Sequence, residues 1–189
     1  MSHNLLLLEN FNRTIDTWLI ALGKYSKSDL TFKPEQGWLI GQLYMHLITD
    51  AGFYLEQISE CLHTYENAEL EPTEFGKQLF ANNDFPDQII VGAPSNHLLP
   101  QPTNKARIQH AMQNLKEQYN NFYPRIIAHA PHSKTKHPGL GYFNSLQWFQ
   151  FAEMHFRHHF RQKARIDQMI NLFKVKDKYH ILYIQGLKR

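Results

Sequence analysis

Residues 144–172 read NSLQWFQFAEMHFRHHFRQKARIDQMINL, and this stretch decides which fold class the chain favours. Its apolar residues recur at intervals of three and four. That period predicts an amphipathic helix from Asn144, a suitable N-cap, to about Leu172. One stripe of the helix holds apolar side chains together with two histidines: Trp148, Ala152, His155, His159, Ile166 and Met169. The stripe predicts that both histidines face the interior of the protein.

The same period recurs at about residues 2–25, 38–65 and 104–128 and predicts three further long helices. Between the second and the third of the four helices, residues 66–103 contain five prolines. This stretch predicts a long crossover connection, with a short helix around Glu74 to Phe80.

Two shorter stretches do not follow the helical period. Residues 131–141 are rich in turn formers and predict a loop, whereas residues 179–184 are apolar but lack a partner strand and stay unassigned. With four long helices and no strand pair, we expect an all-α protein. The expected architecture is a single domain over residues 1–189, a four-helix bundle with a long crossover between helices 2 and 3.

The composition is that of a folded globular domain without a strong charge bias. Of the 189 residues, 42% are apolar, and 20 basic residues against 17 acidic ones leave a formal charge of +3. Basic residues gather near the end of the chain, where a solvated tail is favoured over a polyanion site: Lys174, Lys176, Lys178, Lys188 and Arg189. A nucleic-acid partner is therefore disfavoured.

Cys61 is the only cysteine, so the chain forms no intrachain disulfide. It lies on the apolar side of its predicted helix, which favours a buried structural thiol over a nucleophile. The apolar run Leu5–Leu8 is too short for a signal peptide or a membrane span. We expect a cytoplasmic protein that does not associate with a membrane.

His155 and His159 lie four residues apart, which places their side chains one helical turn apart on the same face. This arrangement suits two ligands of one metal ion. The spacing alone is weak evidence, because twelve histidines in 189 residues produce roughly 0.7 such pairs by chance. Their inward phase adds support, and two alternatives remain: a hydrogen-bonded pair in the core, or a metal site.

A third ligand would have to come from another helix. On the predicted helix 38–65, a polar ridge borders the apolar stripe: Gln42, His46, Asp50 and Gln57. His46 is the natural ligand, and Gln42 or Asp50, each one turn away, could orient its imidazole. The alternative is that His46 only completes a polar edge.

His158 lies on the flank of the inward stripe and is interpreted as a surface histidine or as support for the ligands. Phe156 follows His155, so the zincin motif H-E-x-x-H is absent, and no Glu-x-x-His pair recurs on two helices. A site built on His46, His155 and His159 would bind one metal ion through three neutral ligands and leave a position for water or substrate.

Two segments carry a family resemblance. One is Trp38-Leu-Ile-Gly-Gln-Leu-Tyr-Met-His46-Leu, and the other runs from His137-Pro-Gly-Leu-Gly141 through Gln147-Trp148 to His155-Phe-Arg-His-His159-Phe-Arg-Gln162. They resemble the DinB-like (DinB/YfiT) superfamily of metal-binding four-helix-bundle proteins. The resemblance implies a zinc or nickel site with His46, His155 and His159 as ligands. Gln162 is among the residues expected to support these ligands, and the protein is expected to form a homodimer.

Members of that superfamily include thiol-dependent transferases and isomerases that use low-molecular-weight thiols, and proteins labelled hydrolases by analogy. The resemblance thus implies a metal-dependent enzyme of the thiol-dependent transferase or hydrolase type, with a small-molecule substrate. The alternative is a non-catalytic metal-binding protein of the same fold, with a stress or interaction role.

Overall fold

The computed structural model describes residues 3–34, 37–87, 99, 104–128 and 132–186. Within them the chain is mostly helical, which confirms the expectation of an all-α protein at that level. The elements are α1 (His3–Lys24), α2 (Lys27–Thr31), α3 (Ile40–Cys61), α4 (Glu74–Asn82), α5 (Lys105–Ala128), β1 (Thr135–His137), β2 (Gly141–Phe143) and α6 (Ser145–Gly186).

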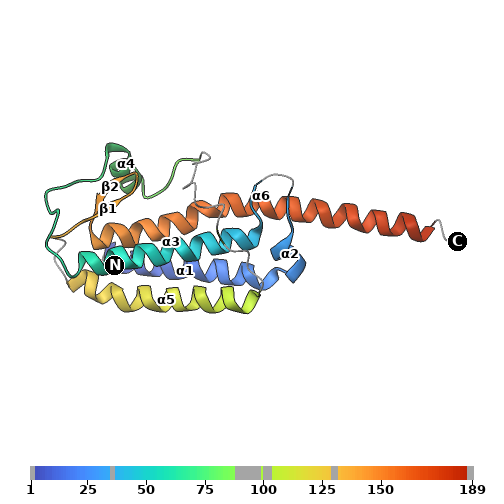
Figure 1. The fold of residues 1–189 in the computed structure, drawn as a ribbon, viewed down its shortest axis with the longest axis horizontal. Coiled ribbons are helices and arrows are strands. Elements are labelled where there is room, and N and C mark those ends of the chain that lie inside the picture. Colours follow the sequence, from blue (N-terminus) through green and yellow to red (C-terminus); the bar gives the residue numbers. More distant parts are fainter. Residues whose placement is uncertain (1–2, 35–36, 88–98, 100–103, 129–131, 187–189) are drawn as a thin grey trace.

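The four long helices α1, α3, α5 and α6 lie side by side (Figure 1). Both α1 and α3 pack against α5 and α6, and the contact between α3 and α6 is the most extensive. Helices α3 and α5 run in one direction and α1 and α6 in the other. At one end of the molecule, Lys105 at the start of α5 donates hydrogen bonds to the carbonyls of Gly23 and Tyr25, where α1 ends.

Aromatic side chains fill the interior between the long helices. The largest fully buried ones are Trp18, Trp148, Tyr44, Tyr119, Phe11, Phe143, Phe149 and Phe156. Their polar tips are paired: the indole of Trp18 donates to the Phe156 carbonyl, and the Tyr44 hydroxyl donates to the Trp18 carbonyl. Since buried polar groups are costly unless they are hydrogen-bonded, these contacts align the helices as well as pack them.

Helix α6 begins where the sequence predicts. Asn144 accepts a hydrogen bond from the Gln147 amide, and the Gln147 side chain accepts one from the Asn144 amide. This reciprocal pair satisfies two donors at the helix start that would otherwise lack partners. The N-cap prediction for Asn144 is confirmed.

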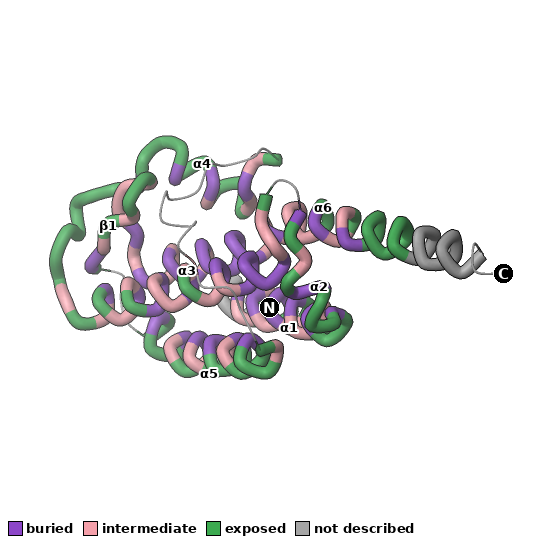
Figure 2. Tube along the Cα trace, turned by 45° about the vertical axis from the view of Figure 1, so that its right-hand side comes forward, coloured by how far each residue is buried: buried purple, intermediate pink, exposed green. Residues whose placement is uncertain are grey.

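The end of α6 differs from the prediction. The helix continues to Gly186 rather than ending near Leu172, and it includes residues 179–184. No glycine or proline interrupts residues 145–185, so nothing stops the helix. The apolar stripe fades because this end extends beyond the other helices, and residues 171–177 are exposed (Figures 1 and 2). Of the predicted basic tail, Lys174 pairs with Asp29 at 2.7 Å, while residues 188 and 189 lie outside the described residues.

The loop predicted at 131–141 and the expectation of no strand pair are wrong in part. Strands β1 and β2 form an antiparallel hairpin in which Thr135 pairs with Phe143 and His137 with Gly141. Three residues a strand are too few to produce an alternating pattern in the sequence. The hairpin is held by tertiary contacts instead: the Trp148 indole donates to the Thr135 hydroxyl, and Lys134 binds the Leu70 carbonyl and the Glu71 carboxylate.

The short helix predicted near Glu74 to Phe80 is confirmed as α4. Helix α2 was not predicted, because its five residues are too few to show a period. A reciprocal cap between Ser26 and Asp29 stabilises it. Part of the predicted crossover, residues 88–98 and 100–103, lies outside the described residues. Within the described part of the chain, no helix has the length and apolar character that a membrane span needs.

We predict that Gly141→Ala destabilises the hairpin. Gly141 has a φ of +87°, and a Cβ atom there would lie 2.6 Å from the Glu71 carbonyl oxygen and 2.7 Å from the Thr73 nitrogen. Conformational strain and backbone overlap together should lower the free energy of unfolding by about 2 kcal/mol or more. Urea denaturation would measure this loss. Gly139→Ala is the matched control, since a Cβ at Gly139 meets no atom within 4 Å; equal losses in the two variants would contradict the explanation.

Candidate metal centre

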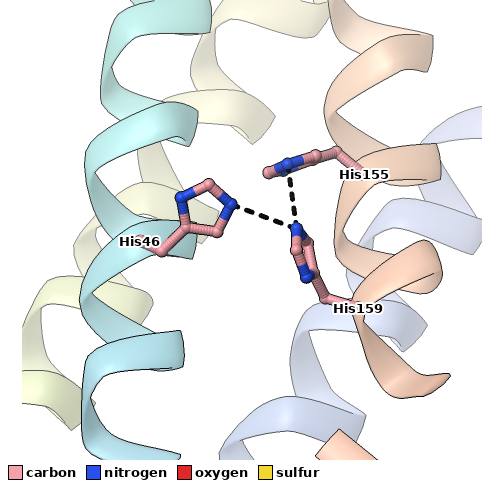
Figure 3. Close-up of side chains that lie close together, drawn as sticks. All are labelled: His46, His155 and His159. Atoms are coloured by element: carbon pink, nitrogen blue, oxygen red, sulfur yellow. Dashed lines mark hydrogen bonds between the residues drawn. The ribbon is translucent and has the colours of Figure 1, made fainter. Parts of the chain in front are cut away.

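Three histidines from two helices meet in the interface between α3 and α6 (Figure 3). The Nε2 atom of His159 lies 3.1 Å from the Nε2 atom of His46 and 3.1 Å from that of His155. The nitrogen atoms that the three rings offer lie within 4.8 Å of one another. Among the described residues, this is the cluster of histidine, cysteine and carboxylate groups whose geometry suits a metal ion.

Local packing explains why the rings converge. His155 and His159 are one turn apart on the inner face of α6, and the antiparallel packing of α3 brings His46 to the same level. Next to the cluster, the ring of Tyr54 on α3 stacks on Trp148 of α6, with centroids 5.5 Å apart. The Trp38 ring meets His46 edge-on at 5.0 Å. Of these contacts, the one between Tyr54 and Trp148 joins the two helices and helps to set their register.

Burial keeps the three imidazoles neutral. His46, His155 and His159 are 5%, 9% and 8% exposed. Desolvation lowers the pKa of His46 from 6.5 to about 4 and that of His159 to about 3. The pKa of His155 is lowered well below 6.5 by desolvation and by its histidine neighbours. A neutral imidazole has a lone pair free for a metal ion, so at neutral pH all three rings are in the state that ligation requires.

Gln162 orients His159. Its side-chain oxygen lies 2.8 Å from Nδ1 of His159, one turn further along α6. An oxygen acceptor at this place puts the ring proton on Nδ1, so the lone pair of Nε2 points into the cluster. The structure thus places Gln162, which the family resemblance pointed to, against a histidine of the cluster.

Asp50 lies against the other two rings. Its Oδ1 atom is 3.5 Å from Nδ1 of His46, and its Oδ2 atom is 3.7 Å from Nε2 of His155. Burial raises the pKa of this carboxyl group to about 6, while a hydrogen bond from the Tyr54 hydroxyl acts against the shift. Nδ1 of His46 is buried and makes no hydrogen bond with the described residues, although the Asp50 carboxylate lies within ion-pair distance of it.

The remaining predicted positions take different places. Gln42 is buried on α3, and Gln57 is half-buried on the same helix. His158 is half-buried, and its ring lies 4.9 Å from that of Phe85 rather than in the three-atom cluster. Cys61 is buried, as predicted, with Sγ 3.5 Å from the Phe143 carbonyl oxygen.

Phe85 covers one side of the cluster, which the sequence did not predict. Phe85 is 8% exposed, and its ring centroid lies 4.9 Å from that of His158 and 6.4 Å from that of His155. Arg157 and Arg161 of α6 bind the segment of residues 83–86 that carries Phe85. Arg157 donates to the Asn83 carbonyl, and Arg161 donates to the carbonyls of Phe85 and Pro86 and to the Asp84 carboxylate.

The arginine contacts leave little sequence signal. Two arginines four residues apart on a helix are common, and their partners lie more than 70 residues away in the chain.

His137 stands out in the sequence only as part of a family motif, yet it is half-buried and its ring lies 5.0 Å from that of Phe151, beside the cluster. Desolvation lowers its pKa to about 4.

The cluster fits a metal ion better than a set of hydrogen bonds. Bonds of 2.0–2.1 Å from nitrogen to a tetrahedral zinc ion imply ligand atoms roughly 3.3 Å apart. Two of the three separations, those from Nε2 of His159, are close to this at 3.1 Å, and all three atoms lie within 4.8 Å of one another. Without an ion, the single lone pair on Nε2 of His159 faces two nitrogens and can accept one good hydrogen bond. A cation placed among the three atoms would satisfy every one of them.

Comparisons with known proteins matched this chain to no family model, no curated protein and no solved structure. The geometry of the three histidines therefore carries the functional argument.

We predict that the metal-free protein loses stability as the pH falls from about 6.5 to about 4. In this window the unfolded chain binds protons at histidines whose pKa values burial lowers in the folded protein: His46, His137, His155 and His159. Folding then releases protons, so acid favours unfolding. Asp50 acts in the opposite sense, because its folded pKa of about 6 exceeds the ordinary 3.8, but one carboxyl opposes four imidazoles.

Urea denaturation in the presence of a chelator, at about pH 7 and about pH 4.5, would measure this loss as a few kcal/mol in total. In His46→Leu the difference between the two pH values should shrink. His110→Leu, at an exposed position on α5, should leave it unchanged. A pH dependence that is the same in wild type and His46→Leu would show that the buried imidazoles are not its source.

Proposed function

We propose that this protein binds one divalent metal ion, zinc or nickel, through His46, His155 and His159. The observation that carries the proposal is the convergence of three buried imidazoles between two helices: Nε2 of His159 lies 3.1 Å from Nε2 of each of the other two, and the three ligand atoms lie within 4.8 Å of one another. Nitrogen ligands suit both ions, and neither choice is favoured by the ligand set alone. The three ligands leave a coordination position for water or substrate.

Neighbouring side chains support the proposed ligands. Gln162 holds His159 with its lone pair directed inward, and Asp50 faces the Nδ1 atom of His46. Such partners fix ring orientation and raise the basicity of a ligand. Gln42 and His158 are proposed to shape the surroundings of the ligands, since both lie close to them on α3 and α6.

We place the chain in the DinB-like superfamily on the strength of its two motifs. In this proposal α1, α3, α5 and α6 form a four-helix bundle within a single domain over residues 1–189. The stretch between α3 and α5 is its crossover. The parallel course of α3 and α5, with α4 between them in the chain, supports that topology. The homodimer and the cytoplasmic location that the sequence suggested are part of the same proposal.

The reaction that this centre suits is that of a metal-dependent transferase using a low-molecular-weight thiol, or of a hydrolase. Bound to three neutral ligands, a divalent ion acts as a Lewis acid that lowers the pKa of a coordinated thiol or water. The chain itself provides a site shielded by Phe85 on one flank. Asp50 supplies a carboxylate within 3.7 Å of a ligand nitrogen. It can hold a donor group of the substrate or accept a proton.

A second candidate is a non-catalytic role in which the ion only cross-links α3 and α6. Its support is the deep burial of all three histidines at the most extensive helix contact of the protein. Against it stands the ligand number, because structural zinc normally takes four protein ligands.

We predict that the protein isolated from medium supplemented with zinc and nickel contains one equivalent of metal by mass spectrometry. The double variant His155→Ala/His159→Ala should lose nearly all of it, since one imidazole holds a divalent ion weakly. A control with the same number of replaced histidines is His110→Ala/His132→Ala, at two exposed positions. A wild-type protein without metal would refute the proposal, and full occupancy in the first variant would refute the ligand assignment.

We predict that a chelator lowers the thermal midpoint by only a few degrees if the site is catalytic. The aromatic core packs α3 against α6 independently of the ion, so the fold should persist without it. Loss of the cooperative transition after metal removal would instead favour the structural role. Differential scanning calorimetry of the wild type with and without chelator distinguishes the two.

A further inference from the structure

The side chain of Asp50 is the more accessible part of the site. It is 30% exposed, whereas the side chains of His46 and His155 beside it are 7% and 11% exposed. Near His155 and His158, Phe85 is held down by the arginine contacts and is 8% exposed. Within the described part of the chain, solvent therefore reaches the histidines more readily beside Asp50 than beside Phe85.

The two carboxylate oxygens of Asp50 have different neighbours. Oδ1 faces Nδ1 of His46, on the outer side of that ring, at 3.5 Å. Oδ2 lies 3.7 Å from Nε2 of His155, which is the nitrogen that points into the cluster, and accepts a hydrogen bond from the Tyr54 hydroxyl at 3.5 Å. A substrate group bound next to His155 would therefore meet this second oxygen.

Asp50 has no cationic side chain of the described residues within ion-pair distance. Three basic residues of the same region of α6 are engaged elsewhere: Arg157 and Arg161 pair with Asp84, and Lys163 pairs with Asp167. Arg165 is exposed and is not within ion-pair distance of Asp50. A half-buried carboxylate without a cation beside it is costly, and a partner that brings a positive charge or a hydrogen-bond donor relieves that cost.

We infer that Asp50 selects the substrate of the metal centre by its charge. The substrate carries an ammonium group, or another N–H or O–H donor, two or three bonds from the atom that binds the metal. It carries no second negative charge at that position. This inference rests on the metal centre proposed above. A divalent ion, three neutral histidines and one carboxylate together carry one net positive charge. One anionic donor atom neutralises it, and a further anionic group meets repulsion from Asp50.

The test uses the full-length protein loaded with cobalt(II), whose absorption reports bound sulfur. Three thiols share the donor atom and differ in the other end: cysteamine carries an ammonium group, 2-mercaptoethanol a hydroxyl group and mercaptoacetate a carboxylate. Titration of the sulfur-to-cobalt band gives a dissociation constant for each. Because the thiols differ in their own acidity, the quantity compared is the cysteamine-to-mercaptoacetate affinity ratio in wild type divided by the ratio in Asp50→Asn. We expect the cysteamine-to-mercaptoacetate affinity ratio to be about tenfold higher in wild type than in Asp50→Asn. The effect of the substitution on the affinity for 2-mercaptoethanol should lie between its effects on the other two thiols.

Glu56→Gln is the matched control, since it removes a carboxylate from the exposed face of the same helix and should keep the wild-type ratio. All samples are compared at equal cobalt content, which separates charge selection from metal affinity. Equal ratios in wild type and Asp50→Asn, or no band with any of the three thiols, would overturn the inference and leave the metal centre standing. Failure of the wild type to take up cobalt would instead overturn the proposed function.

Discussion

Three imidazole nitrogens directed at one point inside the α3–α6 interface set the main constraint on this structure. Polar atoms in such a place need partners, and the two neighbours of the His159 Nε2 atom at 3.1 Å exceed what its single lone pair can satisfy. The arrangement is therefore costly unless something in the centre binds all three rings. A divalent cation meets that requirement with ordinary bond lengths.

The rest of the fold keeps this costly arrangement in place. Aromatic residues with paired polar tips, such as Trp18 and Tyr44, fill the space between the helices. The hairpin formed by β1 and β2 supports the start of α6 through Trp148, whose indole donates to Thr135. Rigid packing matters here because a shift of one ångström in the contact between the helices would separate the three nitrogens.

In the described part of the chain, the charged side chains around the centre fall into two groups, those that pair with an opposite charge and Asp50, which does not. On the Phe85 flank, arginines and aspartates pair with one another and hold a segment without regular structure against α6. Asp50, by contrast, contacts neutral histidines and a tyrosine hydroxyl. Paired charges stabilise the fold. A carboxylate with no cation beside it can still form an ion pair or a hydrogen bond with a ligand. This contrast is why Asp50, rather than the arginines, is assigned a role in recognition.

The sequence alone determined the helical class, the starts of the long helices and the inward phase of His155 and His159, because these follow from local periodicity and capping. It also pointed to His46 as a candidate, since that residue belongs to a polar ridge beside an apolar stripe. It could not show that the three Nε2 atoms meet, because their convergence depends on the register between α3 and α6. The hairpin at 135–143, the cover by Phe85 and the different neighbours of the two Asp50 oxygens were likewise decided only by tertiary structure. Each of them depends in part on contacts between residues far apart in the chain, such as that of Asp50 with His155, and such contacts leave no period in the sequence.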